Sequence, residues 1–588
     1  MRKVLLIGVN AKYIHSNPAI YSLKTYAEAY YPQGADILPP DALDIVEYTI
    51  NQSAEAILSD LYERRPDVVG FSCYIWNWEM IQSIIEELPK LLPDVKIWLG
   101  GPEVSYHCSD ILCKYPQISG IIIGEGEQTF TELLRFYETG KGSLGEIKGL
   151  QLPEGYTGDR GLTDLNELKF FYEDLSKFEN RIIYYESQRG CPFRCAYCLS
   201  SIDKQVRFKD LRVVEKELDF FLEHKVPQVK FIDRTFNCNA KHAMHIWSYL
   251  KEHDNGVTNF HFEIAADLLT KEELEVMSDM RPGLIQLEIG VQSTNERTLK
   301  EINRYFDLGH LRETVATVNS FHNIHQHLDL IAGLPYEDYE SFKCSFNDVY
   351  AMRPEQLQLG FLKVLKGSPM EQRKSEYGLV YRGKPPYEVL YTKWLSYEDI
   401  CKLKAVEEMV EIYYNSNQFI HVLLQLEKEF SDAFSMYEAL ADYYKEKGLF
   451  IQTPSRSYRY QVLLDFAERI NPQKRELYVE LLLFDMYLRE NCKSRPEFAR
   501  QKKEPIELYR EWMRDFYQTR AFSYLTDYEG YSSVQVAKMT HMEEFFYPVW
   551  KKDGVDKRLE KSRLVLFDYR KRDALTYDAG YHVLEMNE

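Results

Sequence analysis

The sequence predicts an α/β protein with an N-terminal doubly wound domain, a partial (β/α)6 barrel of the TIM type and a mainly α-helical C-terminal domain. Its 588 residues exceed the roughly 250 residues at which a single hydrophobic core stops growing. Short apolar runs alternate with amphipathic helical patterns up to about residue 370, and long helical patterns dominate after it. We expect three domains at 1–140, 181–370 and 371–588, with a linker at 141–180.

Residues 1–140 contain strand-like runs that are apolar throughout, a pattern typical of parallel strands with helices on both faces. The expected strands are 3–10, a run near 35–38, 67–74, 95–101 and 120–127, and the expected helices are 19–30, 55–65, 79–92 and 130–138. Ligands of such sheets lie beyond the carboxyl ends of the strands. We therefore expect binding loops at 10–17, 72–77, 100–106 and 124–127.

The polar residues 141–180, rich in Gly, Glu and Asp, suit a linker, and the alternation resumes after them. Six strand and helix repeats follow, which are too few for a closed eight-stranded barrel. The sequence therefore predicts an open barrel with strands at 181–190, 228–236, 260–267, 284–293, 327–335 and 356–364.

Helical periods dominate beyond residue 370. Ser396 is placed to cap a helix in which Leu403, Val406, Met409 and Tyr413 recur at steps of three or four residues. The tyrosine-rich and charged stretches 387–394 and 567–573 either line a pocket or, as we prefer, form solvated helix faces. Similar helical patterns cover 422–447, 456–470 and 473–490.

Charge and cysteine content exclude several classes of protein. The formal net charge of -19 argues against broad binding to nucleic-acid phosphates, which needs clustered Lys and Arg. No apolar run reaches the roughly 18 residues that span a bilayer, and the N-terminal run ends at Gly8 without a signal-type cleavage region. We therefore expect a cytoplasmic protein with neither a membrane nor a nucleic-acid partner. In that reducing compartment a cysteine cluster favours metal binding over disulfides.

Three of the ten cysteines lie together in G-C-P-F-R-C-A-Y-C at residues 190–198. A structural zinc site takes four ligands, typically from two C-x-x-C pairs, and only Cys195 and Cys198 have that spacing. A four-iron cluster held by three thiolates presents one iron to an outside ligand. We therefore expect Cys191, Cys195 and Cys198 to be metal ligands at the catalytic centre, with a zinc or purely structural metal site as the alternative.

C-x-x-x-C-x-x-C after the first strand of a partial barrel, with Tyr197 before the last cysteine, resembles the signature of the radical S-adenosylmethionine (SAM) family. The resemblance implies a [4Fe-4S] cluster whose open iron chelates the amino and carboxylate groups of SAM. One electron from the reduced cluster then breaks a carbon–sulfur bond and gives a 5′-deoxyadenosyl radical.

The same resemblance implies contacts with SAM at the ends of the following strands. Asp233, in F-I-D-R-T-F-N at 231–237, is the expected partner of the methionyl amino group, but Arg234 replaces the second acid common in relatives. Gly333 begins a G-L-P turn that resembles the one against which adenine packs. The expected SAM-binding residues are Tyr197, Asp233, Glu263, Glu288, Gln292 and Gly333.

The N-terminal domain has neither a G-x-G-x-x-G turn nor a P-loop. Its loops G-F-S-C-Y-I-W-N (70–77), G-G-P-E-V-S-Y (100–106) and G-E-G-E (124–127) resemble the flavodoxin- or Rossmann-like cobalamin-binding domains that precede many radical SAM barrels. The D-x-H-x-x-G motif that supplies a histidine to the lower face of the corrinoid is missing, so we expect Tyr74 or Trp76 to cover that face. The expected cobalamin-binding residues are Asn10, Tyr13, Ser72, Tyr74, Trp76, Gly100, Gly101, Glu103, Gly124, Glu125 and Gly126.

These resemblances cover about residues 1–370, and the C-terminal region resembles that of an uncharacterised subgroup of cobalamin-binding radical SAM enzymes. They imply hydrogen abstraction from an unactivated carbon of a small-molecule or peptide substrate, followed by methylation from methylcobalamin. A second SAM then remethylates the corrinoid, and an electron donor such as flavodoxin or ferredoxin reduces the cluster.

Three other functions fit parts of the sequence. A cobalamin-dependent rearrangement or cyclisation without methyl transfer uses the same cofactors. A corrinoid-binding or redox-sensing regulator would not cleave SAM at all. Methylthiolation requires a second cluster on three further cysteines, and Cys73, Cys108 and Cys113 are present in the first domain without a C-x-x-C pair.

Overall fold

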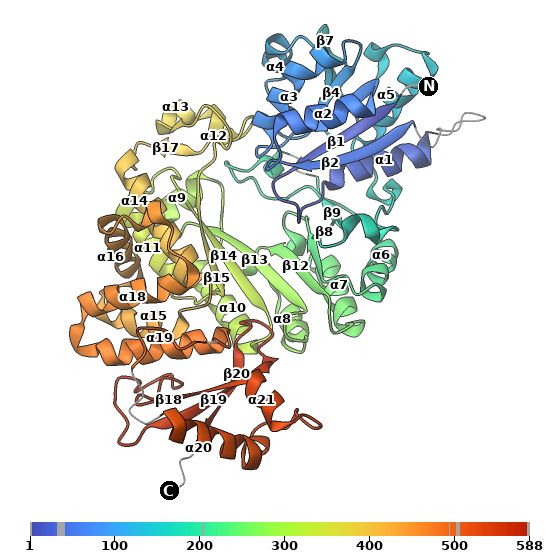
Figure 1. Cartoon of the computed structure of the whole chain (residues 1–588). Helices are drawn as coiled ribbons and strands as arrows, with labels where there is room; N and C mark the ends of the chain where they lie inside the picture. The colour runs from blue at the N-terminus through green and yellow to red at the C-terminus, as the bar shows by residue number, and fades with distance from the viewer. Residues whose placement is uncertain (1–2, 32–41, 203–204, 493, 501–505, 585–588) are drawn as a thin grey trace. The chain divides into compact units, whose positions relative to one another are not determined.

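The chain forms two compact units in the computed structural model, which describes residues 3–31, 42–202, 205–492, 494–500 and 506–584 (Figure 1). The first unit comprises Met1–His322, Ile331–Phe342 and Gly360–Tyr397. The second unit comprises Asn323–Leu330, Lys343–Leu359 and Glu398–Glu588.

The first unit begins with a sheet whose strand order is β2-β1-β3-β4-β5-β6-β7. Its first five strands are parallel, as expected for a doubly wound domain. The expected run near 35–38 lies outside the described residues, and the edge strand β2 lies further along the chain. The bounds of the parallel strands are β1 (Val4–Asn10), β2 (Leu43–Thr49), β3 (Val68–Ser72), β4 (Lys96–Gly100) and β5 (Ile118–Ile122).

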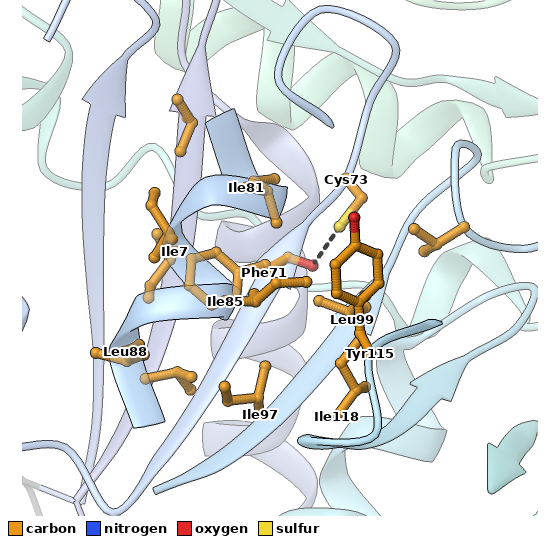
Figure 2. Packing of buried hydrophobic residues seen from close by; sticks show 14 of the residues in the cluster. Ile7, Phe71, Cys73, Ile81, Ile85, Leu88, Ile97, Leu99, Tyr115 and Ile118 are labelled. Atoms are coloured by element: carbon orange, nitrogen blue, oxygen red, sulfur yellow. Dashed lines mark hydrogen bonds between the residues drawn. The ribbon is translucent and has the colours of Figure 1, made fainter. Parts of the chain in front are cut away.

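Successive residues of β1 point to opposite faces of this sheet, and both faces are covered. Leu5, Ile7 and Val9 belong to a buried cluster that also contains residues of α2 (Ala54–Arg64), α3 (Trp78–Leu91) and α4 (Cys108–Lys114). Figure 2 shows part of this cluster, including the hydrogen bond from Cys73 Sγ to the Phe71 carbonyl at 3.6 Å. Val4 and Leu6 pack on the other face with residues of α1 (Pro18–Tyr30) and α5 (Glu127–Thr139). Burial on both faces explains why these strands are apolar throughout.

Part of the expected linker joins the first sheet. β6 (Leu150–Leu152) pairs antiparallel with β5, and β7 (Gly155–Tyr156) pairs antiparallel with β6. Two-residue and three-residue strands give too little periodicity to detect in a polar stretch.

A second sheet has six strands in the order in which they occur in the chain. Neighbouring strands from β8 to β13 are parallel, and helices such as α6 (Leu211–Glu223), α7 (Ala240–Glu252) and α10 (Leu308–Phe321) alternate with them. The first and last strands form the two edges, so this is the partial barrel that the sequence predicts. Its strands are β8 (Ile183–Tyr185), β11 (Gln228–Phe231), β12 (Asn259–Ile264), β13 (Ile285–Gln292), β14 (His325–Ala332) and β15 (Gln356–Phe361).

The second unit contains the expected long helices and a sheet that the sequence analysis missed. The helices include α14 (Tyr397–Met409), α16 (Ala433–Glu446), α18 (Arg456–Ile470) and α19 (Arg475–Arg489). After them β18 (Thr540–Phe545), β19 (Arg563–Arg572) and β20 (Ala579–Leu584) form an antiparallel sheet (Figure 1).

The assignment of 387–394 and 567–573 to helix faces was wrong. The first stretch contains the short strand β17 (Val389–Tyr391), and most of the second lies in β19. In β19 the residues from Leu564 to Asp568 are all buried. Leu564 and Leu566 pack in a cluster with residues of α20 (Ile506–Thr519) and α21 (Ser533–Met539), and Phe567 contacts two aromatic rings of α19. A continuous buried run of this length does not distinguish a strand from a buried helix by its period alone.

Candidate active site

The three clustered cysteines lie on one loop that is closed at its base by a two-stranded ribbon. The loop follows β9 (Gln188–Arg189) and ends at β10 (Arg207–Phe208), and these two strands pair antiparallel. Gly190 begins the loop with φ +96°, and a Cβ atom there would lie 2.5 Å from the Gln205 carbonyl oxygen. Only glycine fits this turn without strain.

Backbone hydrogen bonds attach the cysteine loop to the barrel. The Ala196 N–H donates to the Ile302 carbonyl at 2.9 Å, and the Met370 N–H donates to the Ala196 carbonyl at 3.0 Å. Within the loop, the Cys198 N–H donates to the Cys195 carbonyl at 3.1 Å. The segment between Cys195 and Cys198 is therefore held by neighbours on two sides.

The side chains around the cysteines suit thiolate ligands. Cys191, Cys195 and Cys198 are free thiols, and the first two are buried. Cys191 Sγ lies 3.6 Å from Thr235 Oγ1, and Arg304 Nη1 lies 3.7 Å from Cys195 Sγ. Burial raises the pKa of Cys191, and the neighbouring Cys198 and Cys195 raise it further. Three thiols gathered in a partly buried loop fit a cation or cluster, whose positive charge offsets the negative charge of bound thiolates.

Asp233, the expected partner of the SAM amino group, is fully buried and hydrogen-bonded to the chain itself. One carboxylate oxygen accepts from the N–H of Ser187 at 2.9 Å and of Gln188 at 3.1 Å, and the other accepts from the Ser187 hydroxyl. Burial raises the pKa of Asp233 to about 7. These bonds fix the start of β9, so Asp233 supports the strand that leads into the cysteine loop.

Two other acids expected to contact SAM have partners within the barrel. Glu288 Oε2 accepts from Lys230 Nζ at 2.9 Å and lies 3.0 Å from His261 Nε2. Burial alone would raise the pKa of Glu288, but His261 and Lys230 hold it well below its usual range. Glu263 lies 3.8 Å from Arg234, which is half-exposed.

The remaining residues expected at the SAM site surround the cysteine loop and the strand ends. Tyr197 lies on the loop itself, and Gln292 ends β13 with a left-handed φ of 74°. The Gln292 Oε1 atom is buried and has no hydrogen-bond partner among the described residues. Gly333 has φ +93°, and a Cβ there would lie 2.8 Å from Val389 Cγ1. The glycine is thus required for packing against Val389 as well as for the turn.

A cavity of about 700 Å³ lies at the carboxyl ends of the first sheet and extends along the face covered by α1 and α5. Barrel residues Tyr184, Glu186 and Arg189 also line it. Nine of the residues expected to bind cobalamin line this cavity: Asn10, Ser72, Tyr74, Trp76, Gly100, Gly101, Gly124, Glu125 and Gly126.

Tyr13 and Glu103 are the two expected cobalamin-binding residues that do not line the cavity. The Tyr13 ring is exposed, and the Arg181 guanidinium carbon lies over it at 5.0 Å from the ring centroid. Glu103 is buried and accepts hydrogen bonds from Lys366 Nζ at 2.7 Å and from the Tyr387 hydroxyl. The position of Glu103 after a strand did not reveal that its carboxylate would contact Lys366 and Tyr387, more than 260 residues away in the chain.

The loop after β3 presents two stacked aromatic rings to the cavity. The Tyr74 and Trp76 rings have centroids 4.3 Å apart and planes 8° apart. Asn77, which the sequence analysis did not single out, accepts from the Tyr74 N–H at 2.8 Å and donates to the Val9 carbonyl at 2.9 Å. Its amide is fully buried and therefore rigidifies the loop that carries both rings.

Two polar residues at the end of β1 are tied to neighbouring elements. The Asn10 amide donates to Glu47 Oε1 at 2.8 Å and to the His15 carbonyl at 3.0 Å. His15 Nδ1 lies 2.6 Å from the Tyr184 hydroxyl of β8. Burial lowers the pKa of His15, so its neutral form is favoured.

The three cysteines of the first domain do not suit a second cluster. Cys73 and Cys108 belong to the hydrophobic cluster shown in part in Figure 2, and burial raises the pKa of each. Cys113 is exposed on α4. Two thiols that pack as small hydrophobic groups and a third in solvent do not form a ligand set.

Three family models match consecutive parts of the chain. "B12 binding domain" matches residues 4–134 and "Radical SAM superfamily" matches residues 185–349. The chain thus contains a B12-binding domain followed by a radical SAM domain. "Protein of unknown function (DUF4080)" matches residues 375–567. The resemblances drawn from the cysteine motif, the glycine loops and the C-terminal region are thus confirmed.

Two methyltransferases are similar to this chain. It is 25% identical over 421 residues to 2-(S-pantetheinyl)-carbapenam-3-carboxylate methyltransferase of Streptantibioticus cattleyicolor. It is 24% identical over 406 residues to the cobalamin-dependent radical SAM methyltransferase TokK of Streptomyces tokunonensis. Each match covers 64% of this chain and 58% of the relative, so the chain spans little more than half the length of these relatives.

A solved structure shares the fold. The cobalamin-dependent SAM radical enzyme OxsB, with aqua-cobalamin bound, superposes with a TM-score of 0.57 at 16% identity, over 88% of this chain and 84% of OxsB. The α/β architecture predicted for the first two domains is therefore confirmed. Within the described part of the chain, no helix is both long enough and apolar enough to cross a membrane.

Proposed function

We propose that this protein is an enzyme that binds a [4Fe-4S] cluster, SAM and cobalamin and methylates an unactivated carbon of a small-molecule or peptide substrate. One observation carries the proposal: Cys191, the first of the three cysteines, lies two residues after Arg189, which lines the 700 Å³ cavity of the B12-binding domain. Similarity to two methyltransferases supports methyl transfer over other uses of the same cofactors.

The three cysteines are the proposed ligands of the cluster. The glycines at the end of β4 and after β5 (Gly100, Gly101, Gly124 and Gly126) are proposed to contact the corrinoid. When bound, the cluster supplies one electron to a SAM molecule held at its fourth iron, and the corrinoid carries the methyl group. The Arg304 guanidinium lies 3.7 Å from Cys195 Sγ and places a positive charge beside that proposed ligand.

The cavity has space for the flat corrinoid ring. Its apolar lining is proposed to contact the nucleotide tail of cobalamin. Gly101 has φ +107°, and a Cβ there would lie 2.5 Å from the Cys73 carbonyl oxygen, so no other residue fits this turn. Deeper in the cavity the lining is apolar and includes Leu6, Phe130 and Leu134. Apolar walls exclude water, which protects reactive intermediates from side reactions.

The reaction also requires a reductant and a reducing environment. We propose a flavodoxin or ferredoxin as electron donor and the cytoplasm as location, because free thiols persist there. Neither a nucleic acid nor a membrane is proposed as a partner, in keeping with the net charge of -19.

The test is a reduced, anaerobic assay of the purified protein. We expect iron and sulfide equivalent to one four-iron cluster, a corrinoid absorption band, and release of both 5′-deoxyadenosine and S-adenosylhomocysteine with dithionite and SAM. 5′-Deoxyadenosine without S-adenosylhomocysteine, when substrate is supplied, would instead indicate rearrangement or cyclisation. Bound corrinoid without SAM cleavage would indicate a regulator, and two clusters without corrinoid would indicate methylthiolation.

A further inference from the structure

The ribbon at the base of the cysteine loop places two positive charges side by side. Arg189 of β9 and Arg207 of β10 are direct cross-strand partners. Like charges at opposing positions destabilise a strand pair, and both side chains are largely buried, with 22% and 13% exposed. The ribbon that closes the cysteine loop therefore depends on carboxylates that neutralise these two guanidinium groups.

Glu125 of the G-E-G-E loop supplies a carboxylate to both arginines. Its Oε2 accepts from Arg207 Nη1 at 3.1 Å, and Arg207 Nη2 donates to its Oε1. The same Oε1 atom lies 3.5 Å from Arg189 Nη1. The Thr163 N–H donates to Glu125 Oε2 at 2.7 Å and completes the site. Burial alone would raise the pKa of Glu125, but Arg207, Arg189 and Thr163 lower it to about 2.

Glu127 and Glu186 complete the neutralisation of Arg189. Arg189 Nη2 donates to Glu127 Oε1 at 3.1 Å, and Arg189 donates to both oxygens of Glu186 at 2.9 and 2.8 Å. Glu127 is the first residue of α5 and accepts a hydrogen bond from Ser22 of α1 at 3.1 Å. The two helices that cover one face of the first sheet are thereby connected to β9.

The loop that carries these carboxylates also lines the cavity. Gly124 and Gly126 flank Glu125, and all three line the 700 Å³ cavity together with Arg189. The carboxylate of Glu125 is bonded to the ribbon. If Glu125 contacts the corrinoid, as the sequence predicts, it does so through its backbone. A shift of this loop necessarily moves the partners of Arg189 and Arg207.

We propose that Glu125 is a positioning residue that couples occupancy of the cavity to the conformation of the cysteine loop. The functional meaning of this coupling rests on the proposed function, in which the cavity holds cobalamin and the loop holds the cluster. Arg189, Arg207, Glu127 and Glu186 are the other members of this arginine–glutamate network. Loss of the Glu125 charge removes the carboxylate that the two facing guanidinium groups share, and the ribbon opens more often.

The first test measures hydrogen exchange of the full chain without added cofactors. In Glu125→Gln we expect backbone amides of residues 191–202 to exchange about tenfold faster than in the wild type, equivalent to about 1.4 kcal/mol of opening free energy. The matched control is Glu132→Gln, which breaks another Arg–Glu pair of the same domain, between Arg160 and Glu132 on α5. Equal exchange of 191–202 in Glu125→Gln and wild type would overturn the proposal.

The second test measures coupling between the cofactors. After reconstitution, the rate of iron release to a chelator is compared with and without hydroxocobalamin. We expect hydroxocobalamin to slow iron release severalfold in the wild type and in Glu132→Gln, and the effect to vanish in Glu125→Gln and Arg207→Gln. Arg207→Lys, which keeps the charge, should restore part of the effect.

The two tests separate the coupling from the proposed function. If the wild type binds no hydroxocobalamin or holds no iron, the proposed function fails, and the exchange experiment still decides the role of Glu125. If both cofactors bind and hydroxocobalamin slows iron release equally in wild type and Glu125→Gln, the coupling is refuted while the proposed function stands.

Discussion

The Tyr74 and Trp76 rings are stacked with their centroids 4.3 Å apart, at the edge of the cavity in the B12-binding domain. Trp76 is 45% exposed, and its indole N–H donates to the Val9 carbonyl at 3.2 Å. The pair is therefore a fixed aromatic surface that faces the cavity, which suits contact with a planar macrocycle.

Trp76→Ala should weaken binding of hydroxocobalamin by roughly tenfold, because an aromatic contact contributes about 0.5–1.5 kcal/mol beyond burial. Equilibrium titration followed by absorbance measures this effect. Tyr62→Ala is the control, since Tyr62 is an exposed aromatic residue of the same domain that does not line the cavity. Equal weakening in both variants would place the corrinoid elsewhere.

Replacement of any one of Cys191, Cys195 and Cys198 by alanine should abolish most of the bound iron, because a cubane held by two thiolates is not retained. Iron and sulfide analysis with electron paramagnetic resonance of the reduced protein measures the loss. Cys344→Ala, at an exposed free cysteine, should retain wild-type iron. A Cys195→Ala protein with a full cluster and undiminished SAM cleavage would contradict the assignment.

Gly190→Ala should disrupt the cysteine loop, because its added Cβ would meet the Gln205 carbonyl oxygen at 2.5 Å and its φ is +96°. We expect iron incorporation to fall severalfold while far-ultraviolet circular dichroism stays unchanged. Gly140→Ala also falls at a positive φ, +64°, but its added Cβ meets nothing within 4 Å. That control should lose about 1 kcal/mol of stability and no iron, and comparable iron loss in both variants would rule out the steric cause.

Glu480 makes the folding stability of the second unit depend on pH. This buried acid on α19 accepts hydrogen bonds from the N–H groups of Phe546 and Tyr547, both at 2.8 Å. Burial raises the pKa of Glu480 from 4.5 to about 7. The folded state thus binds the proton more tightly than the unfolded state, so stability is highest below pH 4.5 and falls as the pH rises to about 7.

Glu480→Gln keeps the acceptor oxygen and removes the titration. We expect the wild type to lose on the order of 2 kcal/mol of unfolding free energy between pH 5 and pH 8 relative to the variant. Urea unfolding of both proteins across this range measures the difference. Parallel stability profiles for the two proteins would show that Glu480 is not the titrating group.

The sequence alone predicted the class of the first two domains, and it also indicated the thiol ligands of the proposed cluster site. The spacing of Cys191, Cys195 and Cys198 is a local property, and so are the apolar strands that require cover on both faces. The cysteine motif and the apolar strands could both be recognised in the sequence, because the residues that define each of them are neighbours in the chain. The glycine loops likewise predicted which strand ends would line the cavity.

Tertiary structure alone decided which polar side chains remain available at that site. Asp233, Glu103 and Glu125 all lie at strand ends, yet their carboxylates are bonded to the chain itself. Their partners are 46, 263 and 82 residues away, and the three-stranded sheet of the second unit was missed for the same reason. Pairing between distant segments depends on how strands and loops pack, and periodicity within one segment carries no information about it.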